Sequence, residues 1–133
     1  MLVQTVLTWF DGSPEGEELL QSAIDVALWF DAHLSVASIS FVPEFRRTAQ
    51  YTPGRAVLRM QAAKEASDLM RLAFARLEAQ GVHGVAFPFV TTRSDFKRQF
   101  KGLSRCADVI VQSEMSLLIE DGTLPFTARK RIA

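Results

Sequence analysis

Short apolar runs alternate with amphipathic helical patterns along most of this chain, and that alternation limits the possible folds more than any other feature. The runs with the β-branched and aromatic content of strands cover residues 2–10, 33–42, 85–91 and 107–111. Apolar side chains recur at three- and four-residue steps, as in helices, over residues 14–32, 56–80 and 94–103. The order β-α-β-α-β-α-β, joined by right-handed crossovers, predicts a three-layer α/β/α sandwich with a parallel sheet.

Single residues at the ends of these segments support the assignment. Ser13 is a good N-cap for the first helix, and Pro14 suits the first helical position. Gly81 stands where a left-handed residue ends the second helix, and Ser94 is the expected cap of the third. Pro88 interrupts the third apolar run and cannot donate to a ladder, so we expect that strand at a sheet edge. The first helix is expected to face inward with Leu20, Ala23, Ile24, Ala27 and Leu28.

Length and composition restrict the class of protein. A chain of 133 residues with 48% hydrophobic content can fill one core, so we expect a single domain over residues 1–133. Fifteen Lys and Arg balance fifteen Asp and Glu, which argues against nucleic acid and anionic membranes as partners. The apolar opening stops at Asp11, too soon for a membrane span, and one cysteine, Cys106, excludes an internal disulfide. We therefore expect a cytoplasmic protein.

In a parallel α/β sheet, ligands bind beyond the carboxyl ends of the strands. The segments that follow the four expected strands are Asp11–Ser13, Phe41–Pro43, Thr91–Ser94 and Gln112–Ser116. Any ligand site is expected among these segments.

The order and spacing of these segments resemble the universal stress protein family. The residues that carry the resemblance are Asp-Gly-Ser after the first strand, Val-Pro after the second, and Ala-Asp-Val-Ile-Val as a later strand. The match covers residues 1–112 well, whereas residues 113–133 form an atypical tail. The resemblance implies the strand order 3-2-1-4-5, which places the third strand at an edge, as Pro88 does independently.

The resemblance also implies candidate ligand residues. In nucleotide-binding members, the acid after the first strand lies by the ribose and the backbone after the second strand holds adenine; Asp11 and Val42 match these positions. A glycine-rich segment after the fourth strand holds phosphates, but here its glycine positions carry Gln112, Met115 and Pro125. We therefore expect no ATP binding in the usual manner. The full candidate set is Asp11, Gly12, Ser13, Val42, Gln112 and Ser113.

The family's last helix and strand have no clear counterpart, because only 21 residues follow Gln112 and their end is not strand-like. The chain is then either a naturally shortened domain or part of a longer protein, such as one half of a tandem pair. The family's fifth strand often builds a homodimer. The expected partner is therefore a second copy or a second tandem domain.

Other residues with chemical potential fit structural roles better. Trp9 and Phe10 are expected in the core, and Cys106 as a packed small side chain. His33 and His83 lie at the opposite end of the predicted sheet from the site and have no accompanying carboxylate or cysteine pattern, so we expect no metal site and no catalytic residue.

These observations predict a non-enzymatic stress-response or regulatory domain that acts through dimerisation or partner binding. The alternative is a module of the same family that binds an adenine nucleotide or adenosine. An enzyme of related fold fits less well, because a phosphoacceptor receiver needs an acidic cluster, a flavodoxin a phosphate loop, and an adenylating ATPase a glycine-rich first turn. We expect no resident cofactor, with ATP or AMP as the alternative ligand.

Overall fold

The structure, a computed structural model, describes residues 3–43 and 54–112. The elements alternate in type as the sequence predicts. Their bounds are β1 (Thr5–Phe10), α1 (Pro14–Phe30), β2 (His33–Phe41), α2 (Arg55–Ala79), β3 (Gly84–Thr91), α3 (Arg93–Ser104) and β4 (Val109–Ile110). The tail over residues 113–133 and any later element lie outside the described ranges.

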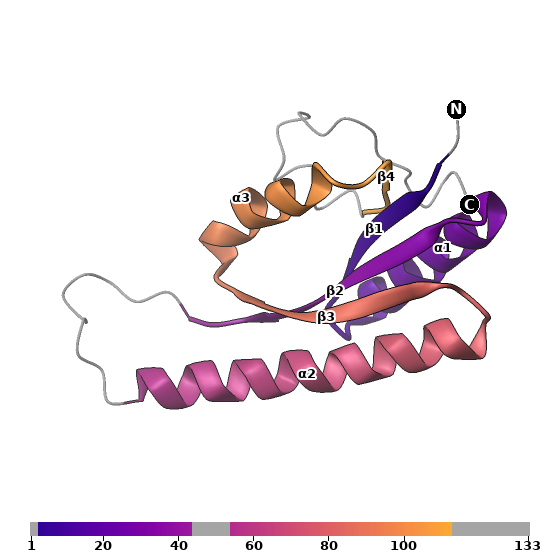
Figure 1. Cartoon of the computed structure of the whole chain (residues 1–133). Coiled ribbons are helices and arrows are strands. Elements are labelled where there is room, and N and C mark those ends of the chain that lie inside the picture. The colour runs from indigo at the N-terminus through magenta and orange to yellow at the C-terminus, as the bar shows by residue number, and fades with distance from the viewer. Residues whose placement is uncertain (1–2, 44–53, 113–133) are drawn as a thin grey trace.

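The strands form one parallel sheet in the order β3-β2-β1-β4 (Figure 1). This arrangement confirms the predicted parallel sheet and the edge position of β3. β4 is the outer strand of the described sheet, and its regular part is shorter than the predicted run at 107–111. Backbone bonds from Asp108 N–H to the Thr5 carbonyl and from Val111 N–H to the Leu7 carbonyl extend its pairing with β1.

Helices cover both faces of the sheet, so the domain has three layers. α1 and α2 pack on one face over a largely aliphatic cluster that includes Leu20, Ile24 and Leu77. α3 packs on the other face through Phe96 and Phe100, which are buried with Leu7, Ala37, Ile39 and Ile110. Figure 1 shows α2 and α3 on opposite sides of the strands. The predicted core positions of Trp9 and Phe10 are confirmed, with Trp9 half-buried against both clusters.

α1 begins as predicted but buries a narrower face. The Ser13 hydroxyl accepts from the Gly16 N–H at 3.0 Å, and the helix ends at Phe30 with Asp31 as its left-handed C-cap, at a φ of +53°. Leu28 was expected to face inward, but it is 48% exposed. At about 100° per residue, Leu28 lies about 40° further round the helix than Ile24, past the edge of the buried arc.

α3 is capped two residues earlier than the sequence suggested. The Thr92 hydroxyl accepts from the Asp95 N–H at 3.1 Å, whereas Ser94, the predicted cap, already lies inside the helix. Thr92 follows β3 in an extended conformation, so its side chain reaches the N–H three residues ahead. At the end of α2, Gly81 has the predicted positive φ, +72°.

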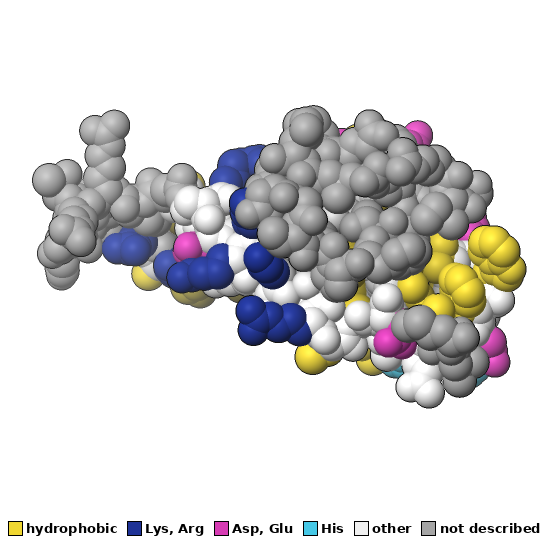
Figure 2. Space-filling view, turned by 90° about the horizontal axis from the view of Figure 1, so that it is seen from above, with side chains coloured by type: hydrophobic (Ala, Val, Ile, Leu, Met, Phe, Trp, Pro, Cys, Tyr) yellow, Lys and Arg dark blue, Asp and Glu magenta, His cyan; other side chains and the backbone are white. Residues whose placement is uncertain are grey.

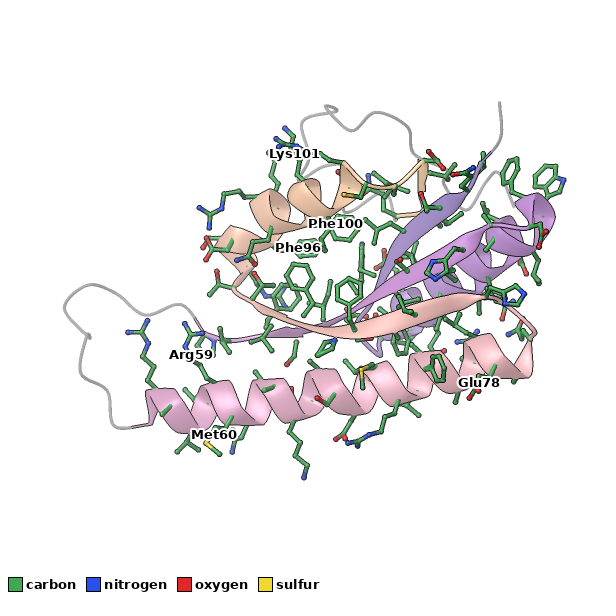
Figure 3. All side chains as sticks on the ribbon, viewed as in Figure 1. Arg59, Met60, Glu78, Phe96, Phe100 and Lys101 are labelled. Atoms are coloured by element: carbon green, nitrogen blue, oxygen red, sulfur yellow. The ribbon has the colours of Figure 1, made fainter. Side chains whose placement is uncertain are left out.

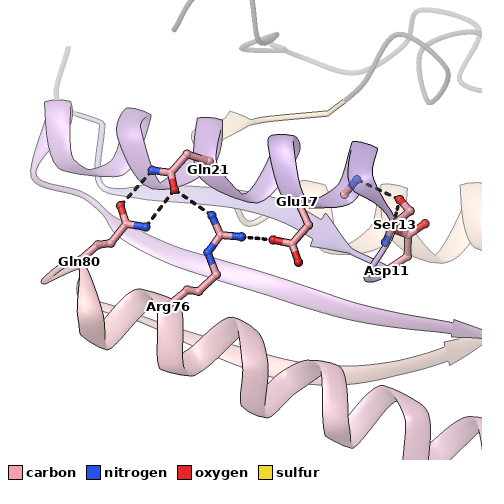
Figure 4. A network of polar contacts seen from close by, with 7 residues as sticks. Asp11, Ser13, Glu17, Gln21, Arg76 and Gln80 are labelled. Carbon is pink, nitrogen blue, oxygen red and sulfur yellow. Dashed lines mark hydrogen bonds and ion pairs between the residues drawn. The ribbon is translucent and has the colours of Figure 1, made fainter.

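A polar network joins the outer surfaces of α1 and α2 (Figure 4). Arg76 of α2 donates to Gln21 at 2.8 Å and forms an ion pair with Glu17. The Gln21 and Gln80 side-chain amides exchange two hydrogen bonds of 2.9 Å. These contacts connect helices that are far apart in the sequence, and no pattern within either helix predicts them.

Candidate functional site

The carboxyl ends of the strands meet at one edge of the sheet but at two levels. Phe10, the last residue of β1, is opposite Ser38, so β2 continues for three more residues to Phe41, which pairs with Thr91. At about 3.3 Å per residue, the ends of β2 and β3 lie roughly 10 Å beyond the end of β1. Figure 1 shows these two strands extending past β1. The candidate residues therefore divide into two groups.

The first group is the β1 turn, residues 11–16, which closes on itself. Asp11 Oδ1 accepts from the Ser13 N–H at 3.0 Å and from the Ser13 hydroxyl at 2.6 Å, while that hydroxyl oxygen also accepts from the Gly16 N–H (Figure 4). Asp11 and Ser13 thus act together as the cap of α1. Asp11 Oδ2 makes no hydrogen bond with another described residue, so one carboxylate oxygen remains available.

Two glycines permit this turn. Gly12 has a φ of +81°, a conformation that costs other residues free energy. A Cβ atom at Gly16 would lie 2.4 Å from Asp11 Oδ1 and 3.3 Å from the Ser13 hydroxyl oxygen. Gly16 was not among the predicted site residues, although a glycine within the first turn of a predicted helix is a signal of close packing.

The second group is the β2–β3 pocket, lined among the described residues by Phe41, Val42, Pro43 and Arg93, with a volume of about 310 Å³. The Arg93 guanidinium carbon lies 4.5 Å from the centre of the Phe41 ring, a cation–π contact. Val42 is buried and its N–H donates to the Thr91 carbonyl at 2.8 Å, so its N–H is already engaged. Arg93 belongs to the segment Thr91–Ser94, where a ligand site was expected, but it was not in the candidate set; the pairing of β2 with β3 brings it beside Phe41.

Gln112 lies at the same edge, on the other side of β1. The parallel pairing of β1 with β4 confirms that Asp11 and Gln112 follow neighbouring strands. The Gln112 side chain, however, is 1% exposed and therefore presents little surface to a ligand. Ser113, the remaining predicted site residue, lies outside the described residues, as do Met115 and Pro125.

The polar residues at the start of α3 are engaged in the fold. The Thr91 hydroxyl donates to the Gln99 side-chain oxygen at 2.6 Å, and Arg98 pairs with Asp95 at 3.2 Å. With the Thr92 cap, these contacts show that the polar side chains of this segment are bonded within the fold.

Elsewhere, Cys106 is exposed, so its predicted packing is wrong: it follows the end of α3, where the chain returns to the sheet. His33 and His83 are also exposed, at the opposite edge of the sheet. Within the described ranges, no group of three or more His, Cys, Asp or Glu side chains is placed to hold a metal ion. None of the described helices is long and apolar enough to cross a membrane.

At that opposite edge, one carboxylate joins β1 to the start of β4. Asp108 Oδ2 accepts from the Gln4 N–H at 2.8 Å and from the Thr5 N–H at 3.1 Å. These backbone bonds, that of Gln4 first, lower the pKa of Asp108 below its ordinary value because they stabilise the charged form. Asp108 therefore links the start of β4 to the start of β1 and is not part of the candidate site.

No protein-family model and no curated protein matches the chain. Solved structures do match it. One, from the universal stress protein family of Burkholderia pseudomallei, superposes with a TM-score of 0.78 at 18% identity over 96% of both chains. A universal stress protein in complex with cAMP matches at 0.62 and 20% identity over 97% of both chains. A third, from Archaeoglobus fulgidus in complex with dAMP, matches at 0.56 and 13% identity over 97% of this chain and 98% of that one.

These similarities show that the chain has the fold of the universal stress proteins. The described strand order agrees with the first four strands that the resemblance implied. At identities of 20% or less, the comparison establishes the fold and leaves the function to the residues of this chain.

Proposed function

We propose that this protein is a non-enzymatic regulatory domain of the cytoplasm that acts by binding, through dimerisation or a partner protein, and that it does not bind ATP in the usual manner. The observation that carries the proposal is the use of the predicted site residues in the fold. Asp11 Oδ1 holds Ser13, the Val42 N–H pairs with β3, and Gln112 is buried. Polar groups that are already bonded or buried within the fold are poorly placed to exchange protons with a substrate, which favours a binding role over catalysis.

Incubation with ATP, AMP and adenosine, followed by chromatographic separation of the products, tests the absence of catalysis. We expect no product above the buffer control. Product formation by the wild type that is abolished in Asp11→Asn, but not in Asp25→Asn, would contradict the proposal. Asp25 is the matched control because it is an exposed acid within α1, outside the β1 turn.

A second candidate function, binding of an adenosine-type ligand, is favoured by the free oxygen of Asp11. Asp11 Oδ2 can accept a hydrogen bond from a ribose hydroxyl, and the β2–β3 pocket lies three residues further along the neighbouring strand. A base in that pocket would meet Val42 through its carbonyl oxygen, because its N–H is engaged. Two proteins of the same fold were solved with cAMP and dAMP.

Isothermal titration calorimetry with adenosine, AMP and ATP tests this second candidate. If adenosine is bound, we expect saturable heat that is similar for adenosine and AMP, because no glycine-rich segment holds the phosphate. The heat should be lost in Asp11→Asn and retained in Asp25→Asn. Equal heats in the two variants would exclude Asp11 from the site.

A further inference from the structure

An apolar hollow lies between the last turn of α3 and the sheet, on the face opposite α1 and α2. Its volume is about 360 Å³, within the range of small-molecule sites in proteins. We call it the α3 hollow. Its lining comes from β1, β2, β3 and the chain around the end of α3, and includes Leu7, Ser35, Phe87, Gly102, Leu103 and Ala107.

The floor of the α3 hollow has a small polar residue in its middle. Leu7 of β1 pairs with Ser35 of β2, and Ser35 pairs with Val85 of β3, so the three side chains form one row across the sheet. Phe87 follows Val85 by two residues and shares its face. Because serine is smaller than its two neighbours in the row, space is left above Ser35.

The wall formed by α3 is open because residue 102 is glycine. A Cβ atom at Gly102 would meet nothing within 4 Å, and the φ of Gly102 is not positive. Neither a close neighbour nor the backbone conformation therefore requires glycine at this position. Glycine inside a helix nevertheless costs stability relative to alanine. A departure of this kind from local preference is typical of functional sites.

The α3 hollow is electrically neutral, since none of its described lining residues is charged. Figure 3 shows Lys101 pointing away from the sheet. Arg105 lies about 180° around the helix from Phe96, which faces the sheet. Figure 2 shows the main group of Lys and Arg side chains toward the end of the molecule where β2 and β3 finish. A charged ligand would lose hydration in the hollow without gaining an ion pair.

One hydroxyl in the α3 hollow is available to a ligand. The Thr5 hydroxyl is engaged, because it donates to the Cys106 carbonyl at 3.3 Å and accepts from the Asp108 N–H at 3.1 Å. Ser35 is half-buried, and its hydroxyl makes no hydrogen bond with a described residue. A ligand without a polar group would cover this hydroxyl and leave it unpaired, which costs free energy.

The volume of the α3 hollow indicates the size of the ligand. A cavity of about 150 Å³ binds one benzene ring. The α3 hollow has about twice that volume, so it can take a molecule of about two fused rings.

We propose that the α3 hollow binds a small neutral molecule of about two fused rings, with one polar group hydrogen-bonded to the Ser35 hydroxyl. The rings would lie against Phe87 and Leu103 and fill the space beside Gly102. This site goes beyond the proposed function. Ser35 precedes Val42 by seven residues, about 23 Å along the direction of β2, so the ligand does not reach the β2–β3 pocket.

Isothermal titration calorimetry of the full chain with indole and 1-methylindole tests the proposal. The two probes have similar shapes, but only indole has an N–H that can donate to the Ser35 hydroxyl oxygen. We expect saturable heat for both, with indole bound about fivefold more tightly. Ser35→Ala should weaken indole about fivefold and should not weaken 1-methylindole. Indole-3-acetate, which carries a carboxylate, should give no saturable heat at the same concentrations.

A filled hollow provides the decisive variant. Gly102→Leu should abolish binding of both probes, because its side chain would occupy the space that they need. It should not lower the melting temperature, since leucine is a better helix former than glycine, and this measurement shows that the variant folds. Gly54→Leu is the matched control, because a Cβ there also meets nothing within 4 Å and Gly54 precedes α2, on the other face of the sheet. It should bind both probes as the wild type does.

Cys106 gives an independent measurement, because it is exposed and lines the α3 hollow. We expect indole to slow its reaction with a soluble thiol reagent in the wild type, and to have no such effect in Gly102→Leu. A thiol that is unreactive without any probe would mean that the hollow is already filled, and would overturn the proposal.

Three calorimetric results would also overturn it: no saturable heat with the wild type, equal binding by the wild type and Gly102→Leu, or equal weakening of both probes by Ser35→Ala. Gly102→Leu should leave the nucleotide titration unchanged, because that titration addresses the carboxyl ends of the strands. The failure of this site and the failure of the proposed function are therefore distinguishable.

Discussion

The β1 turn and the β2–β3 pocket lie at the same edge of the sheet but are held in different ways. The β1 turn is fixed by local hydrogen bonds among Asp11, Ser13 and Gly16, all within six residues of one another. The β2–β3 pocket is fixed by long-range contacts, since Arg93 lies over Phe41, and Phe41 packs edge-on against Phe96 with ring centres 5.8 Å apart. Substitutions in the β1 turn should therefore have local effects, whereas substitutions that disturb the β2–β3 pocket should also destabilise the core.

Phe96→Ala should have the largest effect. Phe96 is 8% exposed and contacts the rings of Trp9, Phe41, Phe89 and Phe100. Its truncation should lower the free energy of unfolding by about 3 kcal/mol or more, measured by urea denaturation. Phe96→Leu, which retains most of the volume, should cost clearly less; equal losses would show that the ring contacts do not hold the pocket.

Gly16→Ala should be the most damaging small change in the β1 turn. Alanine is intrinsically the better helix former by about 1 kcal/mol, but its Cβ would meet Asp11 Oδ1, so we expect a net loss of about 1–3 kcal/mol on thermal unfolding. Gly102→Ala in α3 is the control, because a Cβ there meets nothing within 4 Å and should stabilise. Stabilisation by both substitutions would exclude the close approach at Gly16.

Thr92→Ala should lower the free energy of unfolding by about 1 kcal/mol, through loss of the α3 cap beside the pocket. Ser94→Ala is the control, and should change stability less, because Ser94 is exposed inside the helix and its hydroxyl bonds the Thr92 hydroxyl rather than a backbone N–H. A larger loss in Ser94→Ala than in Thr92→Ala would show that Ser94 is the cap, as the sequence suggested.

Asp108→Asn tests the opposite edge of the sheet, where the Asp108 carboxylate links β4 to β1. The pKa of Asp108 is lower in the folded chain, so its stabilisation is complete above the unfolded-state pKa and is lost as pH falls through the folded value. The wild type should therefore be more stable than the variant near neutral pH, and the difference should vanish in acid. Thermal unfolding over a pH series measures this; a difference independent of pH would contradict the role of the charge.

Arg93→Gln should have the smallest effect on stability, below about 0.5 kcal/mol, because Arg93 is exposed and its contact with Phe41 is at the surface. Thermal unfolding of Arg93→Gln and Phe96→Ala, measured side by side, compares Arg93, which lines the pocket, with Phe96, which supports it from the core. A loss comparable to that of Phe96→Ala would mean that Arg93 holds the pocket together.

Most of the fold could be predicted because its signals are local. Pro88 identified the edge strand, Ser13 the start of α1, and Gly81 the end of α2. Each of these residues acts on its own backbone or on that of its immediate neighbours, so its effect can be read without knowing the fold. The parallel order followed from alternation and handedness, which are also properties of neighbouring segments.

The predictions that failed depended on distance or orientation in space. Leu28 continued the apolar spacing of α1 but lies past the arc that the sheet covers. Ser94 has the chemistry of a cap, but the conformation of the chain leaving β3 gives that role to Thr92. Gln112 lies at the predicted edge with its side chain buried, and its part in a ligand site stays a prediction.

The sequence by itself determined the alternating elements, their parallel arrangement and the edge at which Asp11, Val42 and Gln112 are gathered. Only the tertiary structure decided which polar groups stay free, because a hydrogen bond such as that between Asp11 and Ser13, or between Arg76 and Gln21, depends on atomic positions. It also decided where Arg93 lies and which apolar side chains stay exposed, since strand pairing and helix packing set both. Periodicity fixes which residues share a face, whereas packing fixes how much of that face is covered.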